Sequence, residues 1–205
     1  MSTELPELRS GARRILCRDL TNSEADQFCK YLNLLVKWQG VHRLLGSPDP
    51  HWIVERIFLD SLLFLRVLPP DAREVLDVGS GAGVPGIPLK LVIPDLRLTM
   101  VESRQRRASF LSTAVRELSL RDVRVIPERL ESMVRNGADR FDAVVARCAG
   151  DVGYLFELGA RLARPGGVVI ASGPPKIHPL HVGEWITTPG INSGETRNFA
   201  LYRRK

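Results

Sequence analysis

Apolar positions in the first third of the chain recur at helical spacing. A capping box at 21–24 is followed by apolar residues three or four positions apart, which predicts an amphipathic helix ending near Gly40. Two prolines indicate a loop at 46–52, and residues 53–68 are helical in pattern until a proline pair ends them. We therefore expect residues 1–70 to form a helical N-terminal region packed on the core.

The pattern changes after this proline pair, because short β-branched runs then alternate with helical stretches. Such alternation predicts a parallel sheet with helices on both faces. Pro165-Gly166-Gly167 predicts a turn between the last helix of this series and the strand that follows it. The expected strands are 74–78, 97–101, 123–126, 143–146 and 168–172, and the expected helices are 86–92, 104–118, 129–136 and 151–163.

The C-terminal part has a different pattern. Two strand-like runs, 184–188 and 197–202, are separated by a loop too short for a helix, so they should pair antiparallel at the sheet edge. A parallel five-stranded core closed by such a hairpin is the architecture of class I methyltransferases, which use S-adenosylmethionine, whereas a dehydrogenase Rossmann domain continues its βαβ units. We expect an α/β, Rossmann-like fold with a mostly parallel seven-stranded sheet, in which residues 71–205 form the methyltransferase domain.

Composition and charge narrow the class of protein. A chain of 205 residues, 44% of them hydrophobic, fits one globular domain with at most a small appendage. It contains neither a membrane-spanning apolar run nor a signal-peptide pattern, so a cytoplasmic location away from membranes is expected. The formal net charge is +6, and arginine supplies most of the basic residues. This excess fits a polyanionic partner such as nucleic acid, and it also fits the codon bias of a GC-rich genome.

The cysteines and histidines are scattered. No CxxC pair is present and no histidines have metal-ligand spacing, so neither a disulfide framework nor a metal site is expected. Cys148 could serve as a nucleophile, as in cytosine-C5 methyltransferases, but it lacks their Pro-Cys context.

The stretch LDVGSGAGVPG, residues 76–86, has two glycine fingerprints, GxGxG and GxGxxG. It lies between an expected strand and an expected helix, where glycines let the backbone approach a ligand closely. Asp77 in front of the glycines and two prolines behind them disfavour a pyrophosphate, which needs free amide groups and no nearby anion. Asp77 could accept hydrogen bonds from the loop or, through water, from the amino group of a methionine moiety. We interpret the loop as wrapping the methionine and ribose end of S-adenosylmethionine.

Further candidates follow the later strands. Glu102 could accept both ribose hydroxyls of an adenosine, and the backbone at Leu130 and Glu131 could bind adenine, although Glu131 could instead cap the next helix. Arg147 is either a surface arginine paired with an acid or a residue that meets cofactor or substrate, while Asp142 is expected to fix the loop at its strand's start. The candidate cofactor-binding residues are Asp77, Gly79, Ser80, Gly81, Val84, Glu102, Ser103, Leu130, Glu131 and Arg147.

Several blocks of the chain resemble the glucose-inhibited division protein B family, which are bacterial small-subunit rRNA guanine-N7 methyltransferases. They are the run at 76–111, which includes GSGAG-x-PGIPL, then PERLE, FDAVVARCAG and RPGG, and the resemblance extends over 31–173. It implies S-adenosylmethionine as cofactor and 16S rRNA or the small ribosomal particle as partner. It also implies that the cofactor is held at Gly79, Val84, Leu130, Glu131 and Arg147, and it matches Arg106-Arg107 to a basic pair of the family.

The departures from the family pattern lie where substrate would be expected. Ile57 replaces an expected histidine, Ser172 replaces a lysine, and the asparagine and NLT element after Trp38 are missing. The alternatives are a methyltransferase for a small molecule or another RNA, a non-catalytic cofactor-binding assembly factor, and an NAD-dependent oxidoreductase. In the leading hypothesis the acceptor is guanine N7, which has a lone pair and no proton, so no general base is required. Arg147 would then arrange the cofactor and the guanine, and the protein is expected to be a monomer.

Overall fold

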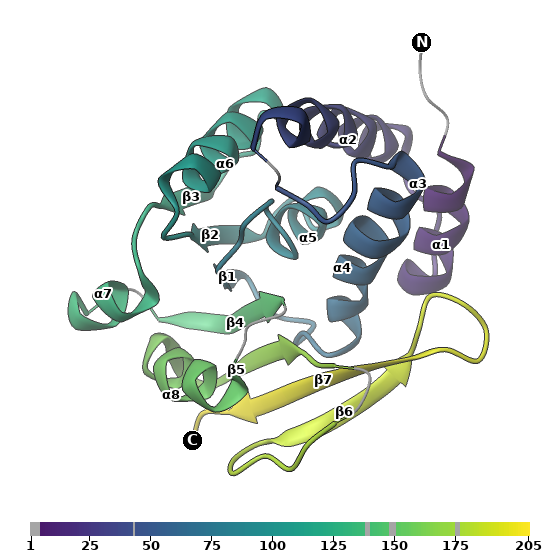
Figure 1. The fold of residues 1–205 in the computed structure, drawn as a ribbon. Helices are drawn as coiled ribbons and strands as arrows, with labels where there is room; N and C mark the ends of the chain where they lie inside the picture. Colours follow the sequence, from purple (N-terminus) through teal and green to yellow (C-terminus); the bar gives the residue numbers. More distant parts are fainter. Residues whose placement is uncertain (1–4, 43, 138–139, 148–150, 175–176) are drawn as a thin grey trace.

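A seven-stranded sheet in the order β3-β2-β1-β4-β5-β7-β6 forms the centre of the protein (Figure 1). The computed structural model describes residues 5–42, 44–137, 140–147, 151–174 and 177–205. Strands β1 to β5 run parallel, and β7 is antiparallel to both of its neighbours, which confirms the expected fold class. The strands are β1 (Glu74–Val78), β2 (Arg97–Val101), β3 (Val123–Ile126), β4 (Phe141–Arg147), β5 (Ala163–Ser172), β6 (Glu184–Pro189) and β7 (Thr196–Arg203).

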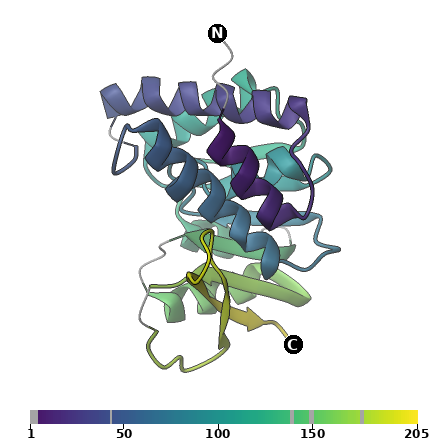
Figure 2. The same cartoon turned by 90° about the vertical axis from the view of Figure 1, so that its right-hand side faces the viewer.

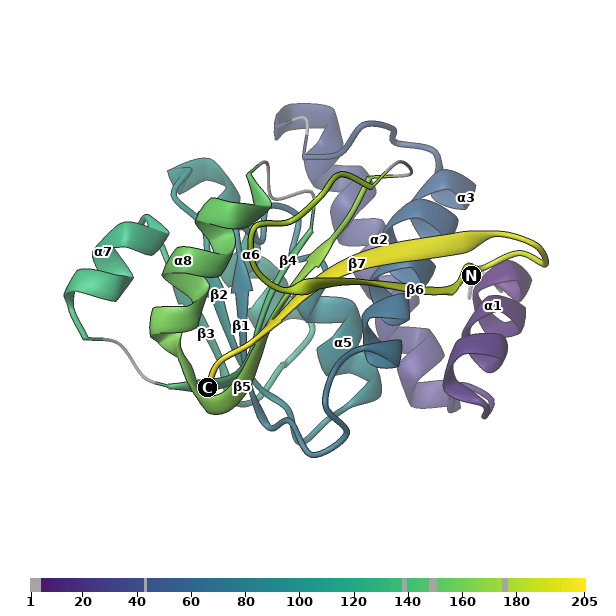
Figure 3. The same cartoon turned by 90° about the horizontal axis from the view of Figure 1, so that it is seen from below.

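Helices cover both faces of the sheet, as Figure 3 shows from below. The N-terminal helices, α5 and α6 share one apolar core with the first face, and α7 and α8 share a second core with the other face. A π-helical segment (Val54–Leu59) and a 3-10 segment (Leu63–Arg66) make α3 and α4 part of one helical stretch. The helices are α1 (Pro6–Leu16), α2 (Asn22–His42), α3 (Pro50–Ile53), α4 (Asp60–Leu62), α5 (Gly86–Val92), α6 (Gln105–Glu117), α7 (Leu130–Arg135) and α8 (Val152–Leu162).

The N-terminal helices stack against one side of the sheet domain (Figure 2). The predicted capping box is confirmed, because the backbone N–H of Thr21 donates to Glu24 Oε2 at 2.7 Å and that of Glu24 donates to Thr21 Oγ1 at 3.2 Å. Further along α2, the rings of Phe28 and Tyr31 each lie 5.2 Å from that of Phe58. This aromatic cluster fixes α2 against the helical stretch that leads into the sheet.

The predicted turn at 165–167 is wrong, because strand β5 already begins at Ala163. Phe141 pairs with Ala163 and Ala143 pairs with Val168, so β5 has extra residues there and the register shifts. Gly166 adopts a φ of +79°, which a bulged strand can use and a regular strand cannot. The proline and glycines therefore form an irregularity within the strand.

Candidate cofactor site

The glycine loop connects the carboxyl end of β1 to α5. Gly79, Gly81 and Gly83 have φ values of +66°, +56° and +89°, a region that L side chains rarely adopt. A Cβ on Gly79 would meet nothing within 4 Å, whereas one on Gly83 would lie 2.5 Å from a side-chain carbon of Ile87. The loop therefore presents an open backbone surface at Gly79 and packs tightly onto its own helix at Gly83.

Asp77 is fully buried beneath this loop. Its Oδ2 accepts a hydrogen bond from the Gly86 backbone N–H at 2.9 Å, while its buried Oδ1 has no hydrogen-bond partner among the described residues. Burial raises the pKa of Asp77 to about 7, the hydrogen bond from Gly86 opposes this rise, and the negative charge of Glu102 adds to it. A cationic group or a hydrogen-bond donor placed next to the unpaired Oδ1 would stabilise this buried carboxylate.

Glu102 connects the glycine loop to the loop after β2. Its Oε2 accepts from the Gly81 backbone N–H at 3.0 Å, and its Oε1 accepts from the Arg104 backbone N–H at 2.8 Å. Each carboxylate oxygen has a second lone pair, so the side chain can still accept from a ribose hydroxyl. Nearby, Ser80 Oγ donates to the Asp77 carbonyl oxygen at 2.9 Å, and Ser103 is exposed.

Tyr31 reaches the glycine loop from α2 and was not identified from sequence as a site residue. Its hydroxyl donates to the carbonyl oxygen of Ala82, and the side chain is fully buried. The pKa of Tyr31 lies well above its ordinary value, chiefly because burial disfavours the phenolate and also because of the charge of Asp77. The N-terminal helical region therefore holds the loop through a neutral hydroxyl. The only sequence signal for Tyr31 was its place in the apolar pattern of α2.

Arg147, at the carboxyl end of β4, lies beside a carboxylate from the N-terminal region. Its Nη2 lies 3.2 Å from Asp60 Oδ2 and also donates to the Arg56 carbonyl oxygen. The same Asp60 oxygen accepts from Arg197 Nη2 at 3.1 Å, so one carboxylate lies between two guanidinium groups. The Nε atoms of both arginines are buried and have no hydrogen-bond partner within the part of the chain that the structure describes. This cluster has a net positive charge and joins α4, β4 and β7.

A cavity of about 250 Å³ opens at the carboxyl ends of β1 and β4. Its lining includes Gly79, Leu130 and Arg147, three of the sequence-predicted residues, together with Asp151 and Tyr154. Of the other predicted residues, Asp77, Ser80, Gly81 and Glu102 lie in the hydrogen-bonded framework behind it, and Val84 is half-buried in the loop.

Tyr154 was missed by sequence reasoning, although it is 47% exposed and lines this cavity. Its hydroxyl donates to Glu131 Oε1 at 2.6 Å, which lowers the pKa of Glu131 and raises that of Tyr154. This bond ties α7 to α8 at the cavity mouth. A tyrosine in an amphipathic helix has no spacing signal that distinguishes it from a surface residue.

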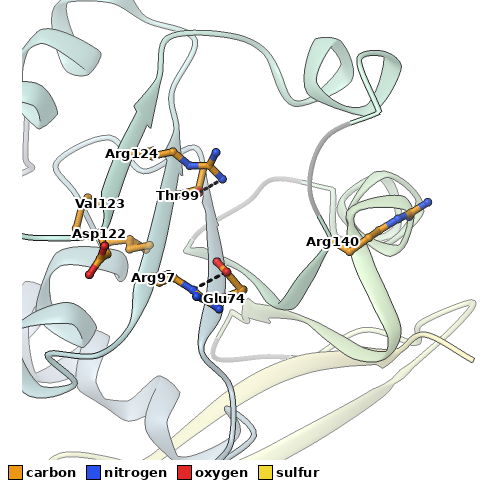
Figure 4. Close-up of a pocket in the computed structure, with 8 residues that line it drawn as sticks. Glu74, Arg97, Thr99, Asp122, Val123, Arg124 and Arg140 are labelled. Carbon is orange, nitrogen blue, oxygen red and sulfur yellow. Dashed lines mark hydrogen bonds and ion pairs between the residues drawn. The ribbon is translucent and has the colours of Figure 1, made fainter.

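A larger hollow of about 640 Å³ lies at the opposite edge of the sheet, at the amino ends of β1 to β3 (Figure 4). Arg97, Thr99 and Arg124 line it from the strands, and Arg140 lies across from them. Ligands of parallel α/β sheets bind at the carboxyl ends of the strands, so this hollow is separate from the cofactor site. Asp142 acts at the same amino edge, where its Oδ2 accepts from the backbone N–H groups of Arg73 and Glu74, as expected for a residue that fixes a loop.

Other expectations concern metals, membranes and Cys148. Within the described ranges, no group of three or more His, Cys, Asp or Glu side chains is placed to hold a metal ion. A search of the same ranges finds no helix that combines the length and the apolar character needed to cross a membrane. Cys148 lies outside the described residues.

The sheet order, the glycine loop at its carboxyl edge and the carboxylate that ends β2 define the class I methyltransferase fold. The chain matches the family model of rRNA small subunit methyltransferase G over residues 24–173 and belongs to that family. This confirms the resemblance to the glucose-inhibited division protein B family and, with it, S-adenosylmethionine as the cofactor.

Relatives and a solved structure agree with this assignment. The ribosomal RNA small subunit methyltransferase G of Stenotrophomonas maltophilia (strain K279a) is 37% identical over 147 residues, which cover 72% of this chain and 68% of the relative. The protein of that name from Syntrophus aciditrophicus (strain SB) is 34% identical over 188 residues, which cover 89% and 78%. The crystal structure of the O-methyltransferase TomG from Streptomyces achromogenes, in complex with S-adenosylmethionine, matches in fold with a TM-score of 0.57 at 20% identity, covering 91% and 92%.

Proposed function

We propose that this protein transfers a methyl group from S-adenosylmethionine to N7 of a guanine in 16S rRNA of the small ribosomal subunit. The observation that carries the proposal is that Gly79, Leu130 and Arg147 line one cavity, although they come from the loop after β1, the start of α7 and the end of β4. Membership in a methyltransferase family supports the reaction, and the names of the relatives support the rRNA substrate.

The residues at this edge suit each part of the cofactor. Asp77 Oδ1 is a buried acceptor without a partner, which suits the ammonium group of a methionine moiety, directly or through water. The open side of Gly79 admits the ligand against the backbone, and the remaining lone pairs of Glu102 suit the ribose hydroxyls. Leu130 and Glu131, at the start of α7, are proposed to contact the adenine.

The chain's own contribution to the reaction is positioning. When bound, S-adenosylmethionine supplies a methyl group on a sulfonium, and guanine N7 has an in-plane lone pair that can attack it without losing a proton. The site therefore needs groups that align two reactants and does not need a general base. Arg147 is suited to this role because Asp60 and the Arg56 carbonyl oxygen hold its guanidinium in one place beside the cavity.

Methyl transfer to small subunits tests the proposal directly. Purified protein is incubated with labelled S-adenosylmethionine and with small subunits from a strain that lacks the modification, and the modified base is then mapped. We expect one N7-methylguanosine in 16S rRNA, and Arg147→Ala should lose most of the rate even at saturating S-adenosylmethionine. Label on a small molecule, at another atom of the base, or nowhere would contradict the proposal, and the last result would favour the non-catalytic assembly factor.

A further inference from the structure

Basic side chains gather where the parallel strands begin, on the edge of the sheet opposite the cofactor site. Arg203 ends the antiparallel strand β7 and pairs with Val168 of β5, which in turn pairs with Ala143 near the start of β4, so it belongs to this same edge. The residues Arg97, Arg121, Arg124, Arg140, Arg164 and Arg203 are all exposed, and we name them the basic edge.

Acidic residues neutralise this edge only in part. Arg97 and Arg164 each form an ion pair of 2.6 Å, with Glu74 and Asp142 respectively, yet their side chains remain 60% and 50% exposed. The guanidinium groups of Arg140 and Arg203 donate to backbone carbonyl oxygens, those of Arg161 and Gly166. A carbonyl oxygen orients a guanidinium without cancelling its charge. Asp122 also lines the hollow, so three acidic residues stand against the six arginines and the edge keeps excess positive charge.

The hollow beside this edge exists because one face of the sheet lacks cover there. Arg97, Thr99 and Arg124 project to the face that carries α7, since the alternate residue Leu98 packs into the core on the other face. Helix α7 has only six residues, and Figure 1 shows it to the left of β2 and β3. The hollow beside these strands, about 640 Å³, falls within the usual range of small-ligand pockets.

Two further arginines flank helix α7. Arg129 immediately precedes α7 and Arg135 lies in its last turn, and both are exposed. Leu130 of the same helix lines the cofactor cavity. Strand β1 has five residues, and at ~3.3 Å per residue the two edges lie roughly 15 Å apart. Glu128 and Glu131 stand beside these arginines, so the stretch along α7 carries no net charge and the excess of positive charge is confined to the basic edge.

We propose that the basic edge and its hollow bind the phosphodiester backbone of rRNA that flanks the target guanine, remote from the methyl-transfer site. The inference rests on the proposed function, because it assumes an rRNA substrate. Arginine forks match phosphate oxygens in pairs, and such contacts fix the register of a nucleic acid without reading its sequence. This surface would position the RNA, so that the carboxyl edge needs to hold only the target nucleotide and the cofactor.

Salt-dependent binding of a 16S rRNA fragment tests this surface. The double variant Arg124→Gln/Arg140→Gln is compared with wild type and with Arg13→Gln/Arg14→Gln, which removes the same charge from exposed positions of α1. Each lost phosphate contact should make the slope of log K against log salt shallower by about 0.7 to 0.9. We expect a slope shallower by about 1.4 to 1.8 and several-fold weaker binding at low salt in the first variant only. Arg121→Gln, an exposed residue before β3, should show about half that change.

The controls separate this inference from the function on which it rests. Thermal unfolding and titration with S-adenosylmethionine should give wild-type values for every variant, which excludes a folding defect. If the wild type binds no rRNA, the proposed substrate is wrong. If the wild type binds and both edge variants bind equally well with the same slope, the inference fails while the proposed function stands. Equal wild-type affinity for anionic phosphatidylserine vesicles, lost in the edge variants, would assign the edge to a membrane surface and also overturn the inference.

Discussion

Replacing Asp77 by asparagine should remove an unusual pH dependence of stability in the cofactor-free protein. The folded chain keeps a proton on Asp77 up to its pKa of about 7, whereas the unfolded chain releases it near the ordinary aspartate value of about 3.9. Between these values the folded state binds more protons than the unfolded state, so this group's contribution to stability falls as the pH rises. The contribution is fully present below about pH 4 and is lost above about pH 7.

The magnitude follows from this difference in pKa. From pH 5 to pH 7, a slope of about 1.4 kcal/mol per unit that declines as the folded group becomes half ionised gives a loss of about 2 kcal/mol. For a domain of this size that corresponds to roughly 4 to 8 °C in melting temperature. Asp77→Asn keeps the shape and an acceptor for the Gly86 N–H but does not titrate.

Urea unfolding of both proteins at pH 5, 6, 7 and 8 isolates the effect. The free energy of unfolding of wild type minus that of the variant should fall by about 2 kcal/mol from pH 5 to pH 7 and level off near pH 8. Other carboxylates contribute equally to both proteins, so they cancel in the difference. A difference that is flat or rises with pH would refute the reasoning that burial controls this carboxyl group.

Three further substitutions test the site. Gly79→Ala and Gly137→Ala both place a Cβ at φ +66° in open space, so each should lower the free energy of unfolding by about 1 kcal/mol. Only Gly79→Ala should weaken S-adenosylmethionine binding, as measured by calorimetry. Tyr31→Phe leaves a buried carbonyl oxygen unpaired and should lower the free energy of unfolding in urea by about 1 to 3 kcal/mol. No loss would mean that the glycine loop keeps its conformation without this hydrogen bond. Asp60→Asn should cost about 3 kcal/mol because it leaves two arginines without a counter-charge. Asp19→Asn, whose ion pair is 72% exposed on both sides, should cost under about 1 kcal/mol, and equal losses would contradict the burial argument.

The regular part of the fold could be predicted from the chain alone. Strands β1, β2 and β3 begin and end at the predicted residues, because short apolar runs are bounded there by charged or turn residues. The start of β5 could not be predicted in this way. Its glycines form a bulge that depends on pairing with Phe141 of another strand, and local sequence does not encode that partner.

The candidate site likewise has a part that could be predicted from the sequence and a part that could not. The carboxyl-edge rule correctly placed Gly79 and Arg147 together, since it depends only on strand direction. The sequence could not show that Asp60 pairs with Arg147, or that Tyr31 holds the loop, because these contacts join residues far apart in the chain. Whether the predicted residues bind S-adenosylmethionine as assigned stays a prediction for the experiments above.

The sheet order has a consequence for how the site is completed during synthesis. Strand β7 lies between β5 and β6, although it follows both in the chain. A nascent chain that ends before Thr196 therefore lacks the native partner strand of β6, and it also lacks Arg197. Asp60 is synthesised 137 residues earlier than Arg197, so the contact between them cannot form until Arg197 has been added. The carboxyl edge with its Asp60 cluster should thus reach its final arrangement only when β7 inserts into the sheet, which would keep chains that end before β7 inactive.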